Sequence, residues 1–451
     1  MLVDRRDWGS QSFMAGDTLM VNRVGTQGIG SAAYWWAREV GGLARAVLYL
    51  TEKQPIWQLV FADDFDWTAE GPFIPDNIIL AIAFLAALGV PWAWKKFGGG
   101  IEYEWIGLWT DWARFSTGLS LKRGTWIADY CRKRLDDNGV LIRELTEVLG
   151  RFVFAAQAIE HVKPLLGPLY AWVAMMPPGA YVPLPGAVRI LLRFLEFIFR
   201  SDEWRISGVV ADGERNGRGS FRADARAKGD VIEGGGWKIS DSGDPSESKW
   251  VSFTLDRVSA PWAYVAGEPF RSIAAIELYT TLITVMTLCD KDCDGLLQLT
   301  SLAGETDNQG NSFAVGRLLS TKFPLNIVLM ELALQLHKRG MVLDLSWIPR
   351  EQNVEADELS NGVFRNFTDS NRITVDISKM DFLVLPLLME EAELFYGELL
   401  TKKKKKQEDK LMLKPKAVAP GNVIDKSVII NTAGGSWMRA GLPLKNRKRK
   451  P

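Results

Sequence analysis

The stretch LLQLTSLAGETDNQGN, residues 296–311, decides the fold because it joins a strand pattern to the start of a helix. Its leucine-rich first half predicts a buried strand, and its polar second half predicts a helix start. The strand would end at Asp307, and the helix would open on Asn308. A carboxylate at the end of a central strand, beside a helix N-terminus, suits a divalent cation and a phosphate. Asp and Asn also cap helices for purely structural reasons, so this stretch alone leaves both interpretations open.

The composition predicts a globular protein of several domains inside the cell. A chain of 451 residues exceeds one hydrophobic core, so we expect two to four domains. Its three cysteines cannot form a disulfide framework and lack metal-site spacing, which favours a reducing compartment, the cytoplasm or the nucleus. The N-terminus has no signal-peptide pattern. The longest apolar run, residues 78–90, is too short to span a bilayer, so we expect no membrane partner.

Charge is distributed unevenly, although the net charge is zero. From Lys402 onward the chain has 15 Lys and Arg against 3 Asp and Glu. A helix over residues 383–400 is expected first. The basic runs at 402–406 and 445–450 then predict disordered segments that bind nucleic acid by charge or act as a nuclear address. A merely solubilising tail is the alternative.

The N-terminal region contains an acidic hairpin. Residues 56–67 predict a strand, a turn and a second strand, with Asp63 and Asp64 at the tip. Adjacent carboxylates there can hold two metal ions for phosphoryl transfer, but Asp is also common in ordinary turns. A helix is expected over residues 78–88. Lys95 and Lys96, a glycine turn and a strand follow it.

These motifs, in this order, resemble the palm of reverse transcriptases, especially those of retrotransposons. VGTQGIGSAAYWW, residues 24–36, resembles the loop and helix beneath the templating base, which implies nucleic-acid contact at Gly28. FADD resembles the catalytic hairpin, with Asp63 and Asp64 as metal ligands. Lys95 or Lys96 falls where the family places a lysine near the incoming triphosphate. EWIGLW resembles the primer-gripping hairpin, so an RNA template and a DNA primer are implied partners.

One departure from this family changes the expectation for polymerase activity. The family carries a further metal-binding Asp on a strand that would precede Met1, and Asp4 is a weak substitute. We therefore expect residues 1–110 to be a truncated palm without polymerase activity. Residues 111–205 predict a helical thumb or connection. Its basic residues would contact phosphate or form a solvated helix face; these are Lys122, Arg123, Arg132, Lys133 and Arg134.

A second domain is predicted over residues 206–378. Its first residues belong to a polar, Gly-rich linker at 201–219, and its pattern of strands and helices begins after that linker. The predicted strands cover residues 221–225, 234–239, 250–255, 296–303 and 341–347. The predicted helices cover residues 273–288, 308–319, 324–339 and 353–359. The order β-β-β-α-β-α-α-β-α matches the ribonuclease H fold, an α/β domain with a five-stranded mixed sheet. The whole chain is thus expected to be α+β and multidomain, with a helix and a basic tail over residues 379–451.

Four acidic residues lie where the ribonuclease H family places its catalytic carboxylates. They are Asp224 on the first strand, Glu277 on the first helix, Asp307 and Asp357. The surrounding ADARAKGDVIEGGGW, IELYTTL, TDNQGN and WIPREQNVEADELSNG resemble the retroelement branch of that family. The resemblance implies two Mg²⁺ ions about 3.5–4 Å apart, with Mn²⁺ an alternative, that hydrolyse the RNA strand of an RNA–DNA hybrid. Packed like charges also predict abnormal titration without metal.

Several assignments stay open at this level. Asn308, Gln309 and Asn311 could read the 2′-hydroxyl of RNA or simply cap a helix. The glycines at 234–236 could admit a nucleic-acid backbone or form a tight turn. His161 and His337 are expected to be structural. The chain is thus interpreted as a fragment of a retroelement polyprotein, with a non-catalytic nucleic-acid-binding remnant as the alternative, and the oligomeric state is not predicted.

Overall fold

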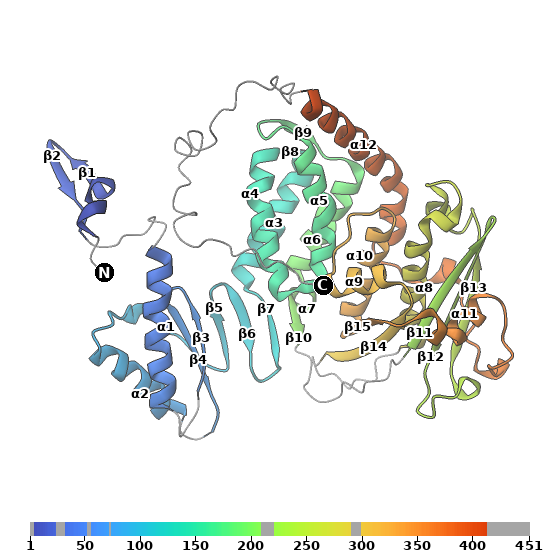
Figure 1. Cartoon of the computed structure of the whole chain (residues 1–451), viewed down its shortest axis with the longest axis horizontal. Helices are drawn as coiled ribbons and strands as arrows, with labels where there is room; N and C mark the ends of the chain where they lie inside the picture. The colour runs from blue at the N-terminus through green and yellow to red at the C-terminus, as the bar shows by residue number, and fades with distance from the viewer. Residues whose placement is uncertain are drawn as a thin grey trace, which may run out of the picture. The chain divides into compact units, whose positions relative to one another are not determined.

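The computed structural model describes residues 4–23, 32–51, 56–71, 74–208, 221–289 and 299–412. The chain forms two compact units, Met1–Ser120 and Leu121–Pro451, each described here by itself (Figure 1). The first unit extends beyond the predicted boundary at residue 110 because a meander of three strands continues through it. These strands are β5 (Glu102–Trp105), β6 (Leu108–Asp111) and β7 (Ser116–Leu119). The predicted boundaries within the second unit stay predictions.

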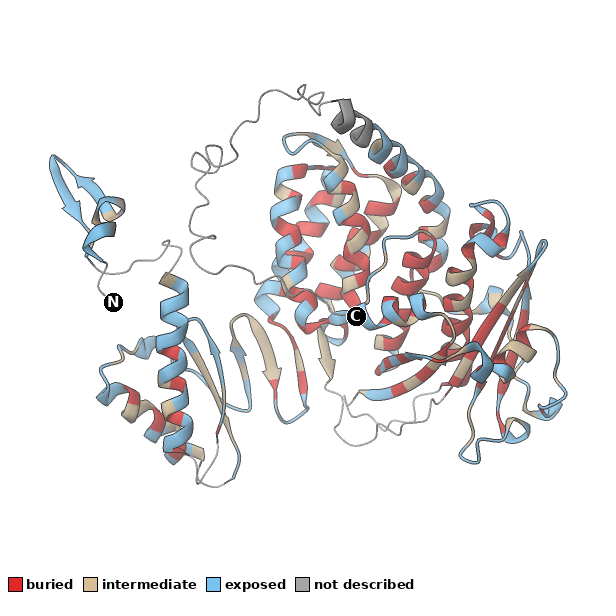
Figure 2. Cartoon of the chain, in the orientation of Figure 1, coloured by how far each residue is buried: buried red, intermediate tan, exposed pale blue. Residues whose placement is uncertain are grey.

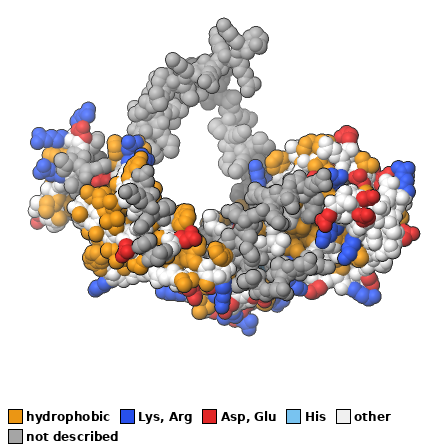
Figure 3. All heavy atoms as spheres, turned by 90° about the horizontal axis from the view of Figure 1, so that it is seen from below, with side chains coloured by type: hydrophobic (Ala, Val, Ile, Leu, Met, Phe, Trp, Pro, Cys, Tyr) orange, Lys and Arg blue, Asp and Glu red, His pale blue; other side chains and the backbone are white. Residues whose placement is uncertain are grey.

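The first unit contains the predicted hairpins but only a small core. Strands β3 (Ile56–Phe61) and β4 (Asp64–Ala69) pair antiparallel, as expected. Four buried residues form its core cluster: Val47, Ile56, Ala81 and Leu85. Most other side chains are exposed (Figure 2), among them Trp57 and Phe61. Hydrophobic side chains cover much of this unit at the left of Figure 3. Its remaining elements are η1 (Arg5–Gln11), β1 (Ser12–Ala15), β2 (Thr18–Val21), α1 (Ala32–Leu50), α2 (Ile74–Ala87) and η2 (Trp94–Lys96).

The second unit opens with the expected helical region. Its helices are α3 (Leu121–Asp137), α4 (Ile142–Ala158), α5 (Lys163–Met175), α6 (Gly186–Arg200) and α7 (Asp202–Arg205), with the turn η3 (Glu160–Val162). Leu191, Leu195 and Ile198 recur at helical spacing along α6 and are buried, which gives this helix one apolar face. Strand β9 (Tyr181–Pro183) lies between α5 and α6 and pairs with β8 (Gly139–Leu141). Strand β10 (Ile206–Gly208) ends this region.

A five-stranded mixed sheet follows, as the sequence predicts. Its strands lie in the order β13 (Trp250–Leu255), β12 (Val231–Lys238), β11 (Phe221–Lys228), β14 (Thr300–Thr306) and β15 (Met341–Trp347). The first three pair antiparallel, whereas β14 is parallel to both β11 and β15. The helices are α8 (Ile273–Leu288), α9 (Gln309–Arg317), α10 (Leu325–Lys338) and α11 (Val354–Ser360). The predicted order of strands and helices is therefore confirmed.

Short 3₁₀ turns connect these elements. They are η4 (Pro245–Glu247), η5 (Pro261–Tyr264), η6 (Pro269–Ser272), η7 (Arg350–Gln352), η8 (Asp369–Asn371) and η9 (Ile377–Lys379). The stretch Pro269–Leu288 is apolar and long enough to cross a membrane, but two thirds of it is buried in the unit. It contains α8, which packs against β11, β12 and α10, so its apolar character is that of a core helix.

Strand β14 ends later than predicted. The expected strand covered residues 296–303, but β14 is Thr300–Thr306, and residues 296–298 lie outside the described residues. Alternation specifies the observed strand, because Leu302, Gly304 and Thr306 are buried and the residues between them are not. The sequence therefore predicted this strand correctly but ended it before Thr306.

The glycines at 234–236 serve neither of the two roles expected from the sequence. All three lie inside β12. A Cβ at Gly234 or Gly236 would collide with Thr280 or Thr284 of α8. A Cβ at Gly235 would collide with Leu359 of α11. Successive residues of a strand face opposite sides, so these glycines let one helix on each face lie directly against the backbone of β12.

Helix α12 (Leu385–Met412) corrects the expected tail. The helix was predicted to end at residue 400, before a disordered lysine run, but residues 402–406 are helical. The start of α12 is fixed by Glu331 of α10, whose buried carboxylate accepts hydrogen bonds from the backbone N–H groups of Leu383, Val384 and Leu385 at 2.8, 2.8 and 2.9 Å. A helix leaves its first N–H groups without partners. The carboxylate of Glu331 supplies the missing acceptors. The basic run at 445–450 lies outside the described residues.

Replacing Glu331 with Ala should lower the stability of the second unit by about 3 kcal/mol, because two buried backbone donors and one partly buried donor would lose their acceptor. Urea unfolding followed by tryptophan fluorescence would measure the change. Glu390→Ala, on an exposed position of α12, is the matched control and should shift the free energy of unfolding by less than about 0.5 kcal/mol. Equal effects of the two substitutions would show that Glu331 does not anchor α12.

Candidate metal centre

Three of the predicted acidic residues converge at one place in the second unit. Asp224 lies in β11, Glu277 on the second turn of α8, and Asp307 directly after β14. One carboxylate oxygen of each lies within 4.8 Å of the others. Strands β11 and β14 are adjacent and α8 packs against β11, so the fold itself brings these distant residues together.

Burial and mutual repulsion change how these carboxyl groups titrate. Burial, reinforced by the charges of Asp307 and Asp357, raises the pKa of Asp224 to about 6. Burial, reinforced by Asp224 and Asp307, raises the pKa of Glu277 to about 8. Burial also raises the pKa of Asp307. These directions agree with the abnormal titration expected for packed like charges. The metal-free site therefore keeps a proton at neutral pH.

Two polar side chains orient these carboxylates. The Ser360 hydroxyl, at the end of α11, donates to Asp224 Oδ2 at 2.7 Å. Asn308 Nδ2 donates to Glu277 Oε2 at 2.6 Å, while its Oδ1 accepts from the backbone N–H of Asn311 at 3.1 Å. Asn308 therefore caps α9 and fixes Glu277 at the same time.

The other two candidates for reading RNA differ in exposure. Asn311 is buried, and its Nδ2 donates to the carbonyl of Ala274 at 2.9 Å. The prediction that Asn311 contacts nucleic acid is therefore wrong, because its side chain faces the core. Gln309 is exposed in the first turn of α9 and stays a prediction.

Asp357 lies beside the group of three and not within it. Asp357 lies in the first turn of α11, close to the predicted position, and its charge contributes to the raised pKa of Asp224 and of Asp307. Its Oδ1 accepts from Arg350 Nη2 at 2.7 Å, and its Oδ2 accepts from Asn361 Nδ2 at 3.1 Å. Among the described residues, the acidic group that could hold a metal contains three of the four predicted ligands.

Sequence reasoning missed Ser360, Asn361 and Arg350 as members of this site. A signal was present for the first two. They lie three and four residues after Asp357, and side chains at these spacings share a helix face. No comparable periodicity points to Arg350, which lies in η7 before the helix.

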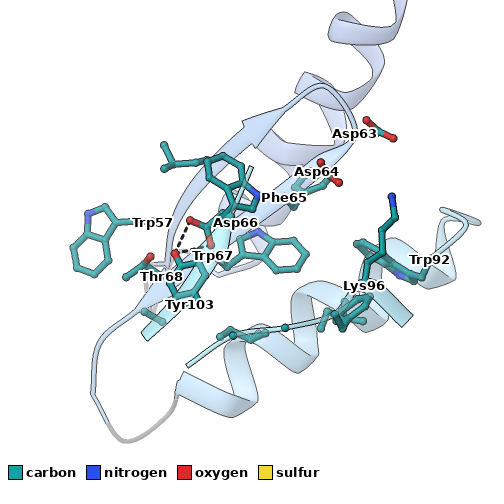
Figure 4. Close-up of a pocket in the computed structure, with 18 of the residues that line it drawn as sticks. Trp57, Asp63, Asp64, Phe65, Asp66, Trp67, Thr68, Trp92, Lys96 and Tyr103 are labelled. Atoms are coloured by element: carbon teal, nitrogen blue, oxygen red, sulfur yellow. Dashed lines mark hydrogen bonds between the residues drawn. The ribbon is translucent and has the colours of Figure 1, made fainter. Parts of the chain in front are cut away.

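The second predicted acidic site lies in the first unit (Figure 4). Asp63 and Asp64 are exposed at the β3–β4 turn and line a cavity of about 2080 Å³, together with Lys96 and Trp92. Lys95 is exposed and does not line it, so Lys96 is the better of the two lysine candidates. Gly28 lies outside the described residues.

A neighbouring carboxylate in this cavity is hydrogen-bonded to a tyrosine of the same cavity. Asp66, which the sequence reasoning did not single out, accepts from the Tyr103 hydroxyl at 2.9 and 3.0 Å (Figure 4). Burial raises the pKa of Asp66, and the Tyr103 hydrogen bond opposes this shift. Asp4 pairs with Arg6. Within the described ranges, neither Asp63 nor Asp64 belongs to a group of three potential metal ligands.

The basic residues of the helical region do not all remain available to phosphate. Arg134 is buried and pairs with Asp137 at 2.8 Å and with Glu144 at 3.5 Å, so its predicted phosphate contact is wrong. Arg132 is exposed but pairs with Asp136 at 3.4 Å. The three others are exposed, and their role stays a prediction; they are Lys122, Arg123 and Lys133.

The two histidines occupy structural positions, as expected. His161 of η3 stacks on His337 of α10 with ring centroids 3.7 Å apart, and Trp204 packs beside both rings. Burial lowers the pKa of His161 well below its ordinary value and that of His337 to about 4. Both imidazoles are therefore neutral at pH 7, and they join the helical region to α10.

Solved structures of reverse transcriptases and a ribonuclease H resemble this chain in part. A foamy viral protease-reverse transcriptase with an RNA/DNA hybrid matches at 13% identity and a TM-score of 0.36, over 76% of this chain and 42% of that chain. A foamy viral protease-reverse transcriptase with dsDNA matches at 12% identity and a TM-score of 0.37, over 77% and 65%. Ribonuclease H1 from the halophilic archaeon Halobacterium salinarum NRC-1 matches at 16% identity and a TM-score of 0.22, over 32% and 95%.

The chain spans less than two thirds of either foamy viral chain. No protein-family model and no curated protein matches its sequence. Because all three TM-scores are below 0.5, the fold given above depends on the topology of this chain alone.

Without divalent cations, the stability of the second unit should fall as the pH rises from about 5 to about 9. The folded protein holds a proton on Glu277 up to about pH 8, whereas an unfolded chain releases it near 4.5. The stabilisation is complete below the lower value and is lost as the pH rises through the higher one. The loss should be at least about 1 kcal/mol.

Urea unfolding in EDTA at several pH values would measure this slope. Glu277→Gln should make the slope shallower, because the amide does not titrate, while the raised pKa of Asp224 keeps part of the slope. Glu268→Gln, at an exposed position before η6, should keep the slope of the unmodified chain. A Glu277→Gln profile as steep as the original would count against a protonated Glu277.

Proposed function

We propose that the second unit hydrolyses the RNA strand of an RNA–DNA hybrid in a reaction that requires a divalent cation. The observation that carries this proposal is the convergence of Asp224, Glu277 and Asp307 within 4.8 Å. Their order along the chain, in elements arranged β-β-β-α-β-α-α-β-α, is the one implied by the resemblance to the ribonuclease H family.

The three carboxylates fit Mg²⁺ or Mn²⁺ by their chemistry. Hard divalent cations prefer carboxylate oxygens, and the group keeps a proton when no cation neutralises it. Asp224, Glu277 and Asp307 would hold the cation. When bound, divalent cations of this kind supply an activated water and stabilise the leaving oxygen of a phosphodiester.

The chain's own residues prepare this site in two ways. The hydroxyl of Ser360 and the amide of Asn308 hold Asp224 and Glu277 in fixed orientations, so the ligands need little rearrangement. The raised pKa values mean that protons must leave before a cation binds, so cation affinity should increase with pH. Gln309, exposed beside Asp307, is the side chain that we propose contacts the hybrid.

Polymerase chemistry in the first unit is a weaker second proposal. Asp63, Asp64 and Lys96 line one cavity, which favours phosphate chemistry there. In the described part of the chain, however, no third acidic side chain completes this pair as a metal site. Primer extension with an RNA template and a DNA primer, in Mg²⁺ or Mn²⁺, would test it directly.

Changing Asp307 to Asn should reduce cleavage of the RNA strand in a labelled hybrid by at least about 100-fold, because a carboxylate ligand is lost. Hybrid binding, measured by fluorescence anisotropy, should remain. Asp344→Asn, at an exposed position on the neighbouring strand β15, is the matched control and should keep full cleavage.

The outcomes separate the proposal from its main alternative. Equal cleavage by Asp307→Asn and the unmodified chain would contradict the assignment of this site. Hybrid binding without cleavage by the unmodified chain, in Mg²⁺ and in Mn²⁺, would instead favour a non-catalytic nucleic-acid-binding protein.

A further inference from the structure

The fourth acidic residue, Asp357, is already paired with a cation that belongs to the chain itself. Arg350 Nη2 donates to its Oδ1 at 2.7 Å, and Asn361 Nδ2 donates to its Oδ2 at 3.1 Å. Asn361 in turn accepts from Arg226 Nη1 at 2.6 Å. Each carboxylate oxygen of Asp357 therefore accepts one hydrogen bond, and these partners hold Asp357 beside the other three acids.

Arg350 lies close enough to influence the neighbouring carboxylates as well. Burial raises the pKa of Glu277 and of Asp307, and the positive charge of Arg350 opposes both shifts. The guanidinium thus partly neutralises the same cluster that a divalent cation would neutralise. This makes Arg350 and a cation competitors for one region of negative charge.

The side chain of Arg350 can leave this position without disturbing the fold. It is 74% exposed, against 34% for its partner Asp357. The backbone around it is fixed independently, because the N–H groups of Gln352 and Asn353 donate to the carbonyls of Pro349 and Arg350. Exposed arginine–carboxylate pairs contribute little net stability, so this pair can be exchanged for a stronger one.

We infer that Arg350 is a positioning residue that acts as an exchangeable counter-ion for Asp357. It holds Asp357 in the cation-free protein, and a divalent cation must replace it before Asp357 can join Asp224, Glu277 and Asp307. This inference rests on the proposed function, because it concerns the cations of the same site. It predicts that the guanidinium of Arg350 and a divalent cation compete for the carboxylate of Asp357, and that removing Arg350 strengthens cation binding.

Titration calorimetry of the full chain with Mn²⁺ tests this without any nucleic acid. Arg350→Ala should bind Mn²⁺ about three- to tenfold more tightly than the unmodified chain. Arg350→Lys, which keeps the charge, should stay near the original affinity. Arg365→Ala is the matched control, because Arg365 is 73% exposed and pairs with Glu358 on the same helix at 2.6 Å, so its affinity should not change.

A second pair of variants separates a specific exchange from a general effect of charge. In an Asp357→Asn background, Arg350→Ala should give a clearly smaller gain in Mn²⁺ affinity, because its partner carboxylate is gone and only its longer-range charge on Glu277 and Asp307 remains. A gain there as large as in the unmodified background would overturn the inference, as would an Arg350→Ala variant with unchanged affinity. If the unmodified chain bound no Mn²⁺ at all, the proposed function itself would fail, and this inference with it.

Discussion

The close approach of two helices to strand β12 is the constraint on which the candidate site depends. Helix α8 lies against one face of this strand and α11 against the other, and neither could do so if residues 234–236 carried side chains. Helix α8 brings Glu277 to Asp224, and α11 brings Ser360 to it. Asp224 is the register partner of Gly235, so the glycine that admits α11 lies directly opposite the first carboxylate.

The same closeness creates an electrostatic problem that the surrounding residues reduce but do not remove. Three carboxylates within 4.8 Å repel one another, and burial deprives them of water. Hydrogen bonds from Ser360 and Asn308 offset part of this penalty, and proton uptake by Glu277 offsets more. The arrangement of these three carboxylates is one that could hold a divalent cation.

Much of this fold could be predicted from local patterns, and the failures have identifiable physical causes. The limits of β13, α8 and β15 agree with prediction, because α8 is an apolar run long enough for a helix and the two strands are short apolar segments rich in β-formers. The end of β14 was missed because the predicted strand was assigned from the leucines at its start, whereas buried positions alternate along β14 as far as Thr306. Helix α12 was cut short because its lysines were interpreted by charge alone, although lysine is a good helix former and Glu331 anchors the helix.

The site was predictable in its acidic members and not in their partners. Asp224, Glu277 and Asp307 each follow from a position in a strand or helix. The pairing of Arg350 with Asp357 depends on how η7 folds back over the start of α11, which no sequence periodicity encodes. Asn311 was misjudged for the same reason, since its burial depends on the packing of α9 against α8.

The stacked pair of histidines has a practical consequence for anyone who studies this chain in solution. These are the chain's two histidines, and they touch each other where η3 meets α10. Every imidazole resonance in a proton spectrum therefore originates at the contact between η3 and α10. The protein thus carries a native spectroscopic probe of this contact, and no isotope label or engineered reporter is needed to follow it.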